Sequence, residues 1–266
     1  MTKKDRKVAG SLFLLAAAVL CLPLIFAAQQ KRAKSGNKIA ADLEAKLARK
    51  ADFVPSNKST LDRLIAIAKY YEIPMGIEWM GGMGSEDLEV PAAAVPASHT
   101  VRDLLSAIVS RLPDYQLTVQ NGVVHVAPPV IAVRNDNFLN LVIEDFEVDN
   151  DTLFGAEHDL RIAIDMTLHP KENEGGYAGG YGNDPEHVFA KRRFSYKSDD
   201  LTVRQILDGL VKANGNALWI AEFDRADFAP QAKSNTGGPV VDKAEESKRQ
   251  WKFVPLRDNL VARRPS

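Results

Sequence analysis

The sequence predicts an α+β protein built from two tandem small β-α-β-β-α-β-type modules that follow an N-terminal hydrophobic helix. The main observation is that the ten-residue segment Thr100–Val109 returns as Thr202–Val211 with five identical positions. A repeat of this kind indicates two copies of one structural unit. Each copy is followed by a predicted strand, and an uncharged apolar stretch lies near the N-terminus.

The N-terminal stretch has the form of an export signal or a membrane anchor. Four basic residues within Lys3–Lys7 precede the apolar run Val8–Ala28, whose 21 residues would span roughly 31 Å as a helix. That length is enough to cross a hydrocarbon core of about 30 Å, although Pro23 would kink the helix. We expect residues 1–28 to be a cleaved signal peptide or an uncleaved anchor in the inner membrane. The rest of the chain is then periplasmic or otherwise extracytoplasmic.

Residues 29–52 are predicted to be a spacer with a short amphipathic helix, and residues 53–129 the first module. Apolar residues at helical spacing predict a helix after the N-cap Ser59, and a second helix begins at Thr100. The dipeptide Asn121-Gly122 favours a type I′ turn in a hairpin. The remaining predicted strands are a leading strand near Phe53 and strands at 75–79 and 88–90.

Residues 138–256 are predicted to form a second, degenerate module. Thr202 caps the repeated helix, and Gln205 completes a capping box. A glycine-rich loop at 174–183 and a polar linker at 229–249 interrupt the module. The segment Trp251–Val254 is expected to supply the missing last strand, with Trp251 and Phe253 on one side. The other expected elements are a strand carrying Val142, Phe146 and Val148, a helix opened by Asp151-Thr152, and strands at 192–197 and 216–223.

The first module resembles the short N-terminal domain that is shared by bacterial secretins and TonB-dependent receptors. The resemblance rests on three stretches, and the second module matches more loosely through Thr202–Val211 and Asn216–Ile220. It implies periplasmic, non-catalytic domains that dock partner proteins or neighbouring copies, often through exposed sheet edges. No secretin pore domain or receptor barrel follows, so the chain is more similar to a standalone exported protein. The three stretches are Ser59–Leu64, Thr100–Leu105 and Tyr115–Val126.

Composition argues against a nucleic-acid partner. The whole chain has 34 basic and 35 acidic residues, and loss of residues 1–28 removes four basic residues and one acidic residue, which leaves 30 and 34. A nucleic-acid-binding protein usually has a basic surplus, because it displaces counterions from phosphates. The single cysteine, Cys21, lies in the apolar N-terminal stretch, so no disulfide within the chain and no cysteine nucleophile in the modules are expected.

The usual signatures of catalysis are not found in the sequence. The five histidines have no recognised metal-binding spacing, and His125 alternates within a predicted strand, which favours a role on the sheet surface. No nucleophile elbow or phosphate-binding loop is present. We therefore expect that the protein is not an enzyme and that it has no catalytic residue, metal or cofactor. The histidines are His99, His125, His158, His169 and His187.

Four aromatic residues are candidates for partner binding. Tyr177 and Tyr181 project from the glycine-rich loop, which could equally be an insertion without a partner, and Trp251 and Phe253 lie in the predicted last strand. The leading hypothesis is a non-enzymatic interaction module of the bacterial envelope that binds protein partners, including further copies of itself, and that contacts the membrane through residues 8–28 if they are uncleaved. The alternatives are an envelope-polymer hydrolase with a site between the modules and a structural ring or filament subunit.

Overall fold

The computed structural model divides the chain into two units, residues 1–44 and 45–266, and the fold described below belongs to the second. A short helix at residues 39–47 agrees with the predicted amphipathic helix. No helix in the described part of the chain is long and apolar enough to cross a membrane, and residues 1–28 lie outside that part. The described residues are 39–53, 55, 59–81, 100–170, 192–224 and 250–256.

The first segment, residues 53–129, forms helices and strands largely where the sequence predicts them. Ser59 caps its first helix by accepting a hydrogen bond from the Asp62 amide. Asn121 and Gly122 have φ values of 51° and 79°, as a type I′ hairpin turn requires. The elements in chain order are α2 (Thr60–Tyr71), β1 (Met75–Gly81), α3 (Val101–Val109), β2 (Gln116–Gln120) and β3 (Val123–Ala127).

The second segment, residues 138–256, follows a single turn of helix, α4 (Pro129–Ala132). Its longest helix begins after the N-cap Thr152, and Trp251–Val254 lies in the last strand, so both predictions are confirmed. The elements are η3 (Phe138–Asn140), β4 (Val142–Asp151), α5 (Leu153–Leu168), β5 (Phe194–Thr202), α6 (Val203–Asn214), β6 (Ala217–Asp224) and β7 (Gln250–Pro255).

The predicted α+β class is confirmed, but the strands of the two segments join in one sheet. Five strands lie in the order β2-β3-β1-β6-β7, and β1 from the first segment pairs in parallel with β6 from the second. The outer pairs, β2 with β3 and β6 with β7, are antiparallel. Strands β4 and β5 form a separate two-stranded antiparallel sheet. The described strands therefore do not form two modules with separate sheets.

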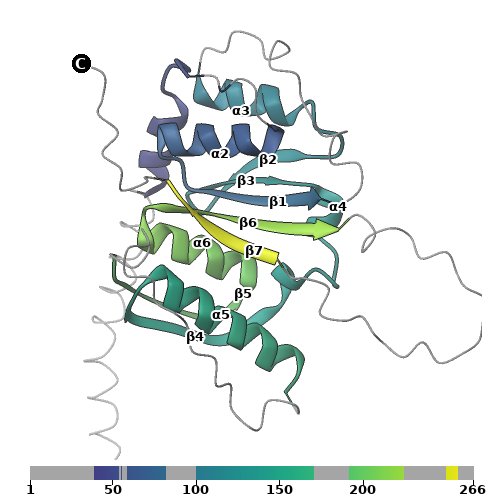
Figure 1. Cartoon of the computed structure of the whole chain (residues 1–266), viewed down its shortest axis with the longest axis vertical. Helices are drawn as coiled ribbons and strands as arrows, with labels where there is room; N and C mark the ends of the chain where they lie inside the picture. The colour runs from purple at the N-terminus through teal and green to yellow at the C-terminus, as the bar shows by residue number, and fades with distance from the viewer. Residues whose placement is uncertain are drawn as a thin grey trace, which may run out of the picture. The chain divides into compact units, whose positions relative to one another are not determined.

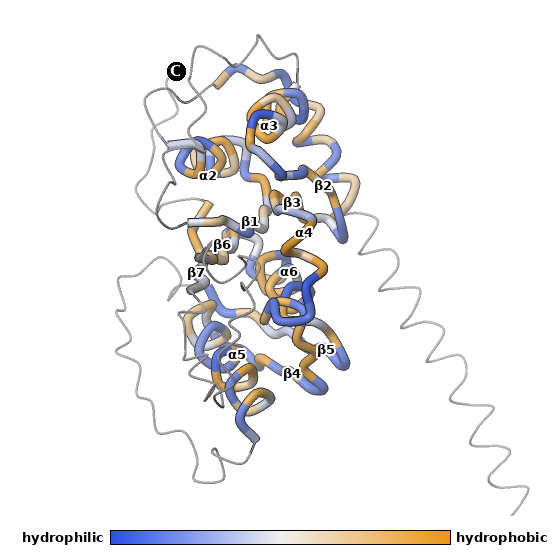
Figure 2. The backbone as a smooth tube through the Cα atoms, turned by 90° about the vertical axis from the view of Figure 1, so that its right-hand side faces the viewer, coloured by the Kyte–Doolittle hydropathy of each residue, from blue (hydrophilic) through white to orange (hydrophobic). Residues whose placement is uncertain are grey.

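The second unit is layered around this sheet. Helices α2 and α3 cover one face of the five-stranded sheet, and α6 with α5 lies between its other face and the β4–β5 sheet (Figure 1). Apolar residues from β4, α5, α6, β6 and β7 form one buried cluster in that middle layer. Hydrophobic and hydrophilic residues alternate around α2, α3 and α5, so each helix has an apolar face (Figure 2).

The two copies of the repeat have the same local structure. Thr100 and Thr202 each accept a hydrogen bond from the third helical residue, whose side chain bonds back to the cap amide. In both copies the amide of the next residue donates to the carbonyl of a residue that lies well before the helix in the chain. These bonds are Val101 to Arg49 and Val203 to Leu141, each 2.9 Å long. The repeat is thus structural as well as sequential.

The prediction of a leading strand near Phe53 is wrong. Residues 51–53 are irregular, because the amides of Asp52 and Phe53 donate to the Tyr71 hydroxyl at 2.9 Å instead of to a strand. The Phe53 ring stacks on Tyr70 with 4.4 Å between ring centroids. The predicted strand at 88–90, the glycine-rich loop at 174–183 and the linker at 229–249 lie outside the described residues.

Candidate functional site

A row of three residues crosses the middle of the five-stranded sheet on the face covered by α6. Gly76 in β1 lies opposite His125 in β3 on one side and opposite Trp219 in β6 on the other. Residues that are directly opposite in a sheet share a face. A Cβ atom at position 76 would overlap the Trp219 indole, so the glycine makes room for the ring. The His125 and Trp219 rings approach each other over it, with 6.0 Å between centroids.

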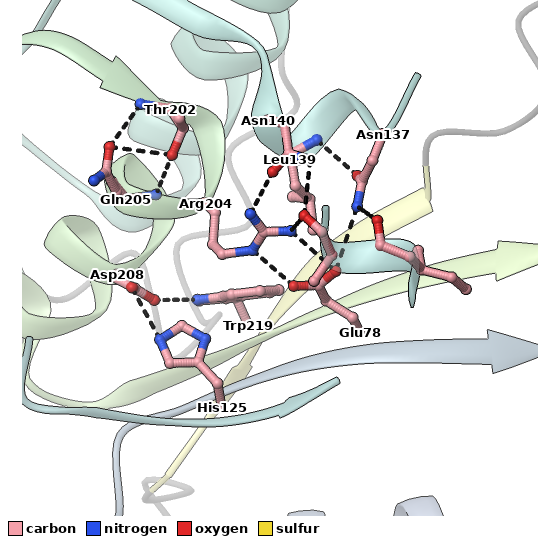
Figure 3. A network of polar contacts seen from close by, with 12 residues as sticks. Glu78, His125, Asn137, Leu139, Asn140, Thr202, Arg204, Gln205, Asp208 and Trp219 are labelled. Carbon is pink, nitrogen blue, oxygen red and sulfur yellow. Dashed lines mark hydrogen bonds and ion pairs between the residues drawn. The ribbon is translucent and has the colours of Figure 1, made fainter. Parts of the chain in front are cut away.

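Asp208 of α6 joins the two aromatic rings of this row (Figure 3). Its Oδ1 accepts a hydrogen bond of 2.9 Å from Trp219 Nε1, and its Oδ2 lies 3.1 Å from His125 Nε2. The second contact is close enough for an ion pair but is not aligned as a hydrogen bond. All three side chains are buried. The prediction that His125 lies on the sheet surface is therefore wrong, because α6 covers this part of the sheet.

A second polar contact, which is partly buried, lies one helical turn earlier in α6. Arg204 donates from Nε to Glu78 Oε1 at 2.7 Å and from Nη2 to Glu78 Oε2 at 3.1 Å. This two-bond geometry matches the planar guanidinium to the carboxylate. Glu78 follows Gly76 by two residues in β1, so it faces α6 as well, and it is 1% exposed. The pair links the first segment to the second.

Two asparagines complete the polar network around Arg204. Asn140 accepts from Arg204 Nη1 and donates to the carbonyls of Ala132 and Arg134 at 2.8 and 2.7 Å. Asn137 donates to the Ile131 carbonyl at 3.1 Å and approaches Glu78 Oε2 at 3.4 Å (Figure 3). The turn that connects the two segments is therefore held against α6 and β1.

The charged groups of this network bind one another. Both oxygens of Glu78 and both of Asp208 have protein partners. Removing one member of a buried ion pair leaves an uncompensated charge, which strongly destabilises the folded state. No group of three or more metal-ligating side chains occurs among the described residues.

The sequence alone did not reveal this network, although it contained three signals. Arg204 and Asp208 are four residues apart in a helix, which places them on the same face. Glu78 interrupts an apolar strand between Ile77 and Trp79, which are both buried. A charged residue in such a strand suggests a partner in a covering helix. His125 carried a similar signal, because its neighbours in β3 are valines that are also buried.

The aromatic residues predicted to bind partners do not belong to this network. Trp251 and Phe253 are 3% and 7% exposed, and their rings pack edge to face with 5.5 Å between centroids. Arg161 lies 4.4 Å from the Trp251 ring centroid and donates to the Trp251 carbonyl at 2.6 Å. These contacts favour a role in core packing. Tyr177 and Tyr181 lie outside the described residues.

The two ends of the five-stranded sheet differ in chemistry. At one end, β7 carries Lys252 and Pro255, and Arg161 engages one of its carbonyls. At the other end, β2 contains no charged residue and no proline. Its residues alternate between exposed and half-buried, with Leu117 and Val119 half-buried. Charges and prolines normally protect edge strands from pairing with other chains, so β2 lacks the protection that β7 has.

Comparisons with protein-family models, with curated proteins and with solved structures found no match to this chain. The geometry of the described residues is therefore the basis on which a function can be assigned. The resemblance to the short N-terminal domains of secretins and TonB-dependent receptors stays a prediction from the sequence.

Proposed function

We propose that the chain is a non-enzymatic interaction protein of the bacterial envelope that binds an extended segment of protein along β2. The observation that carries this proposal is the uncharged outer edge of β2, which lies at the end of the sheet without a neighbour among the described strands. Strand addition to such an edge is a common mode of peptide recognition, because main-chain hydrogen bonds supply affinity whatever the side chains are.

The hairpin determines which main-chain groups of β2 are free to accept a strand. Gln120 and Val123 flank the two-residue turn and are opposite each other, so they form a hydrogen-bonded pair. Such pairs alternate along an antiparallel ladder, which makes Thr118 with His125 the next one. The amides and carbonyls of Leu117 and Val119 therefore point outward, away from β3. They offer two donors and two acceptors to a neighbouring strand.

The other described strand edges are less suited to this role. In the two-stranded sheet, β4 carries five acidic residues and β5 carries one lysine and two aspartates. Lys197 and Glu147 pair across it at 2.8 Å. An incoming strand would have to accommodate these charges, whereas β2 presents only glutamine and threonine on its exposed positions. The charge pattern therefore supports β2 over the other edges.

The envelope location is proposed from the predicted export segment at residues 1–28. The alternative function of an envelope-polymer hydrolase requires acidic or histidine side chains that converge on a substrate, such as two facing carboxylates. The two buried carboxylates nearest the junction of the segments, Glu78 and Asp208, are held by Arg204, Trp219 and His125 instead. This observation favours binding over hydrolysis.

Site-specific photo-crosslinking tests the proposal. A photoreactive amino acid replaces Thr118 in β2 or, as the matched control, Lys252 in β7, in cells that make the full chain at its natural level. Both side chains are exposed. We expect a protein adduct from position 118 and not from position 252. The adduct should disappear with Val119→Pro, which removes an outward amide, and persist with Val119→Thr, which keeps it. Equal adducts from both positions, or none from position 118, would contradict the proposal.

A further inference from the structure

Strand β2 reads almost the same in both directions. Its sequence is Gln-Leu-Thr-Val-Gln, so Thr118 lies at the centre with an apolar residue and then a glutamine on each side. A surface that contacts its own copy across a two-fold axis must be self-complementary, and an edge strand with this symmetry meets that condition. We propose that the segment bound by β2 is β2 of a second copy of this chain, antiparallel and centred on Thr118. This inference rests on the function proposed above and adds the identity and register of the partner.

The outward main-chain groups fit this register. With Thr118 opposite Thr118 of the second copy, Leu117 lies opposite Val119 of the second copy, and the converse pair forms on the other side of the axis. Leu117 and Val119 are the residues whose amides and carbonyls point outward. Each of the two pairs exchanges both of its hydrogen bonds, as residues do in the hydrogen-bonded positions of an antiparallel ladder. The ladder therefore continues from one copy into the next without a bulge.

The side chains fit the same register on both faces. On the face where β2 is exposed, the pairs are threonine with threonine and glutamine with glutamine, and cross-strand pairs of this polar kind are favourable. Half-buried Leu117 and Val119 lie on the other face of β2, a strand that contacts α3, and they gain burial in this register. No like charges oppose each other. Pairing through a charged strand such as β4 would bring acidic residues together instead.

The geometry also stops the assembly at two copies. A two-fold contact uses the same edge of both molecules, so it closes on itself. The outer edges of the joined sheet would be the two copies of β7, which carry Lys252 and Pro255. Contacts through two five-residue strands bury less area than the roughly 1,200–2,000 Å² of stable interfaces, so the dimer should be weak and concentration-dependent.

Disulfide trapping tests the register directly in the full chain, in detergent solution and with Cys21 replaced by serine. Thr118→Cys places two cysteines opposite each other in a non-hydrogen-bonded pair, where Cα atoms are about 4.5 Å apart and within disulfide range. We expect an oxidised covalent dimer. Gln120→Cys alone should not be trapped, because its two copies would be roughly 13 Å apart along the strands. A mixture of Gln116→Cys and Gln120→Cys chains should be trapped as a mixed dimer.

A charge exchange at the same position separates self-pairing from binding of another protein. Thr118→Lys and Thr118→Glu should each weaken the dimer about tenfold or more, because like charges meet at the axis, and their mixture should restore it. Monomers at all concentrations by light scattering, with no trapping of Thr118→Cys, would overturn the inference. In that case an adduct with a different protein from position 118 would leave the proposed function standing, and the lack of any adduct would overturn both.

Discussion

Helices α3 and α6 begin with the same residues and the same cap, but their surroundings differ. Helix α3 covers one face of the five-stranded sheet, and Ser106 on its outer side is exposed. Helix α6 lies between two sheets, and Asp208 at the matching position is 3% exposed. The next matching pair is Ala107 in α3 and Gly209 in α6, where the glycine allows the Tyr196 ring of β5 to approach the helix. The shared residues specify a capped helix, and the differing residues determine which neighbours it accepts.

The same contrast separates the two ends of the sheet. The second segment encloses its helices between sheets and ends in a protected strand, β7. The first segment leaves one side of α3 to solvent and supplies the unprotected outermost strand β2. We infer that the second segment mainly stabilises the fold, whereas the first provides the docking edge. Matched substitutions at repeat-equivalent positions can test this division.

The largest difference is expected between Arg204 and its equivalent, Arg102. Arg204→Ala leaves Glu78 buried without its charge partner and should lower the free energy of unfolding by about 3–5 kcal/mol. Arg102 lies in the first turn of α3 and is also half-buried, and Arg102→Ala should lower it by about 1 kcal/mol at most, as a typical point substitution does. Urea unfolding followed by circular dichroism measures both. Equal losses in the two variants would show that the Glu78–Arg204 contact adds nothing particular to the free energy of unfolding.

The next largest difference is expected between Asp208 and Ser106. Asp208→Ala removes the acceptor of the buried Trp219 indole N–H and the neighbour of His125, which should lower the free energy of unfolding by about 2 kcal/mol. Ser106→Ala changes an exposed helical position and should have almost no effect. The Trp219 environment can be followed by near-ultraviolet circular dichroism. An unchanged spectrum in Asp208→Ala would argue against the indole contact.

At Gly209 we expect a smaller change in stability, and the direction of that change is informative. Alanine normally stabilises a helix interior relative to glycine by about 1 kcal/mol. At position 209 the added Cβ would overlap the Tyr196 ring, so Gly209→Ala should instead destabilise the protein by about 1–2 kcal/mol. The reverse change in α3, Ala107→Gly, should also destabilise it, because glycine is the poorer helix former.

The Tyr196 ring provides the control for the Gly209 substitution. Burial raises the pKa of its hydroxyl, which fits a ring enclosed between β5 and α6. In a Tyr196→Leu background, Gly209→Ala should lose most of its destabilising effect. Thermal unfolding of the two single variants and the double variant measures this coupling. Additive effects would mean that the ring and the helix do not compete for space.

The smallest difference is expected at the two caps. Thr100→Ala and Thr202→Ala each remove a hydroxyl that accepts from the amide of the third helical residue and donates to its side chain, so each should lower the free energy of unfolding by about 1 kcal/mol. This near equality is the control for the larger contrasts deeper in the helices. A large excess for either threonine would indicate that the two copies begin differently despite their matching bonds.

The features that the sequence predicted correctly depend on neighbouring residues. The helix caps at Thr100 and Thr202, the turn at Asn121-Gly122 and the apolar helix faces all follow from short-range spacing. The pairing of Trp251–Val254 with β6 could also be anticipated, because the first segment ends in a hairpin and the second needs an equivalent strand. Local chemistry was sufficient for these elements.

The features that could not be predicted depend on distant partners. The parallel pairing of β1 with β6 joins residues that are more than a hundred positions apart, and no local pattern encodes it. Once those strands are neighbours, Glu78 and His125 face α6, and their burial becomes understandable. The expected strand near Phe53 failed for a related reason, because the Tyr71 hydroxyl binds the amides that a strand would use.

Amide-resolved hydrogen exchange of β2 tests the docking edge most directly. In dilute full-length protein in detergent, the amides of Leu117 and Val119 should exchange rapidly, whereas that of Thr118, which is bonded to β3, should exchange slowly. At high protein concentration the Leu117 and Val119 amides should become protected, while the exposed edge of β5 should not change. If these two amides are already protected in the dilute protein, or if concentration has no effect on them, β2 is not an open edge that pairs with a second copy.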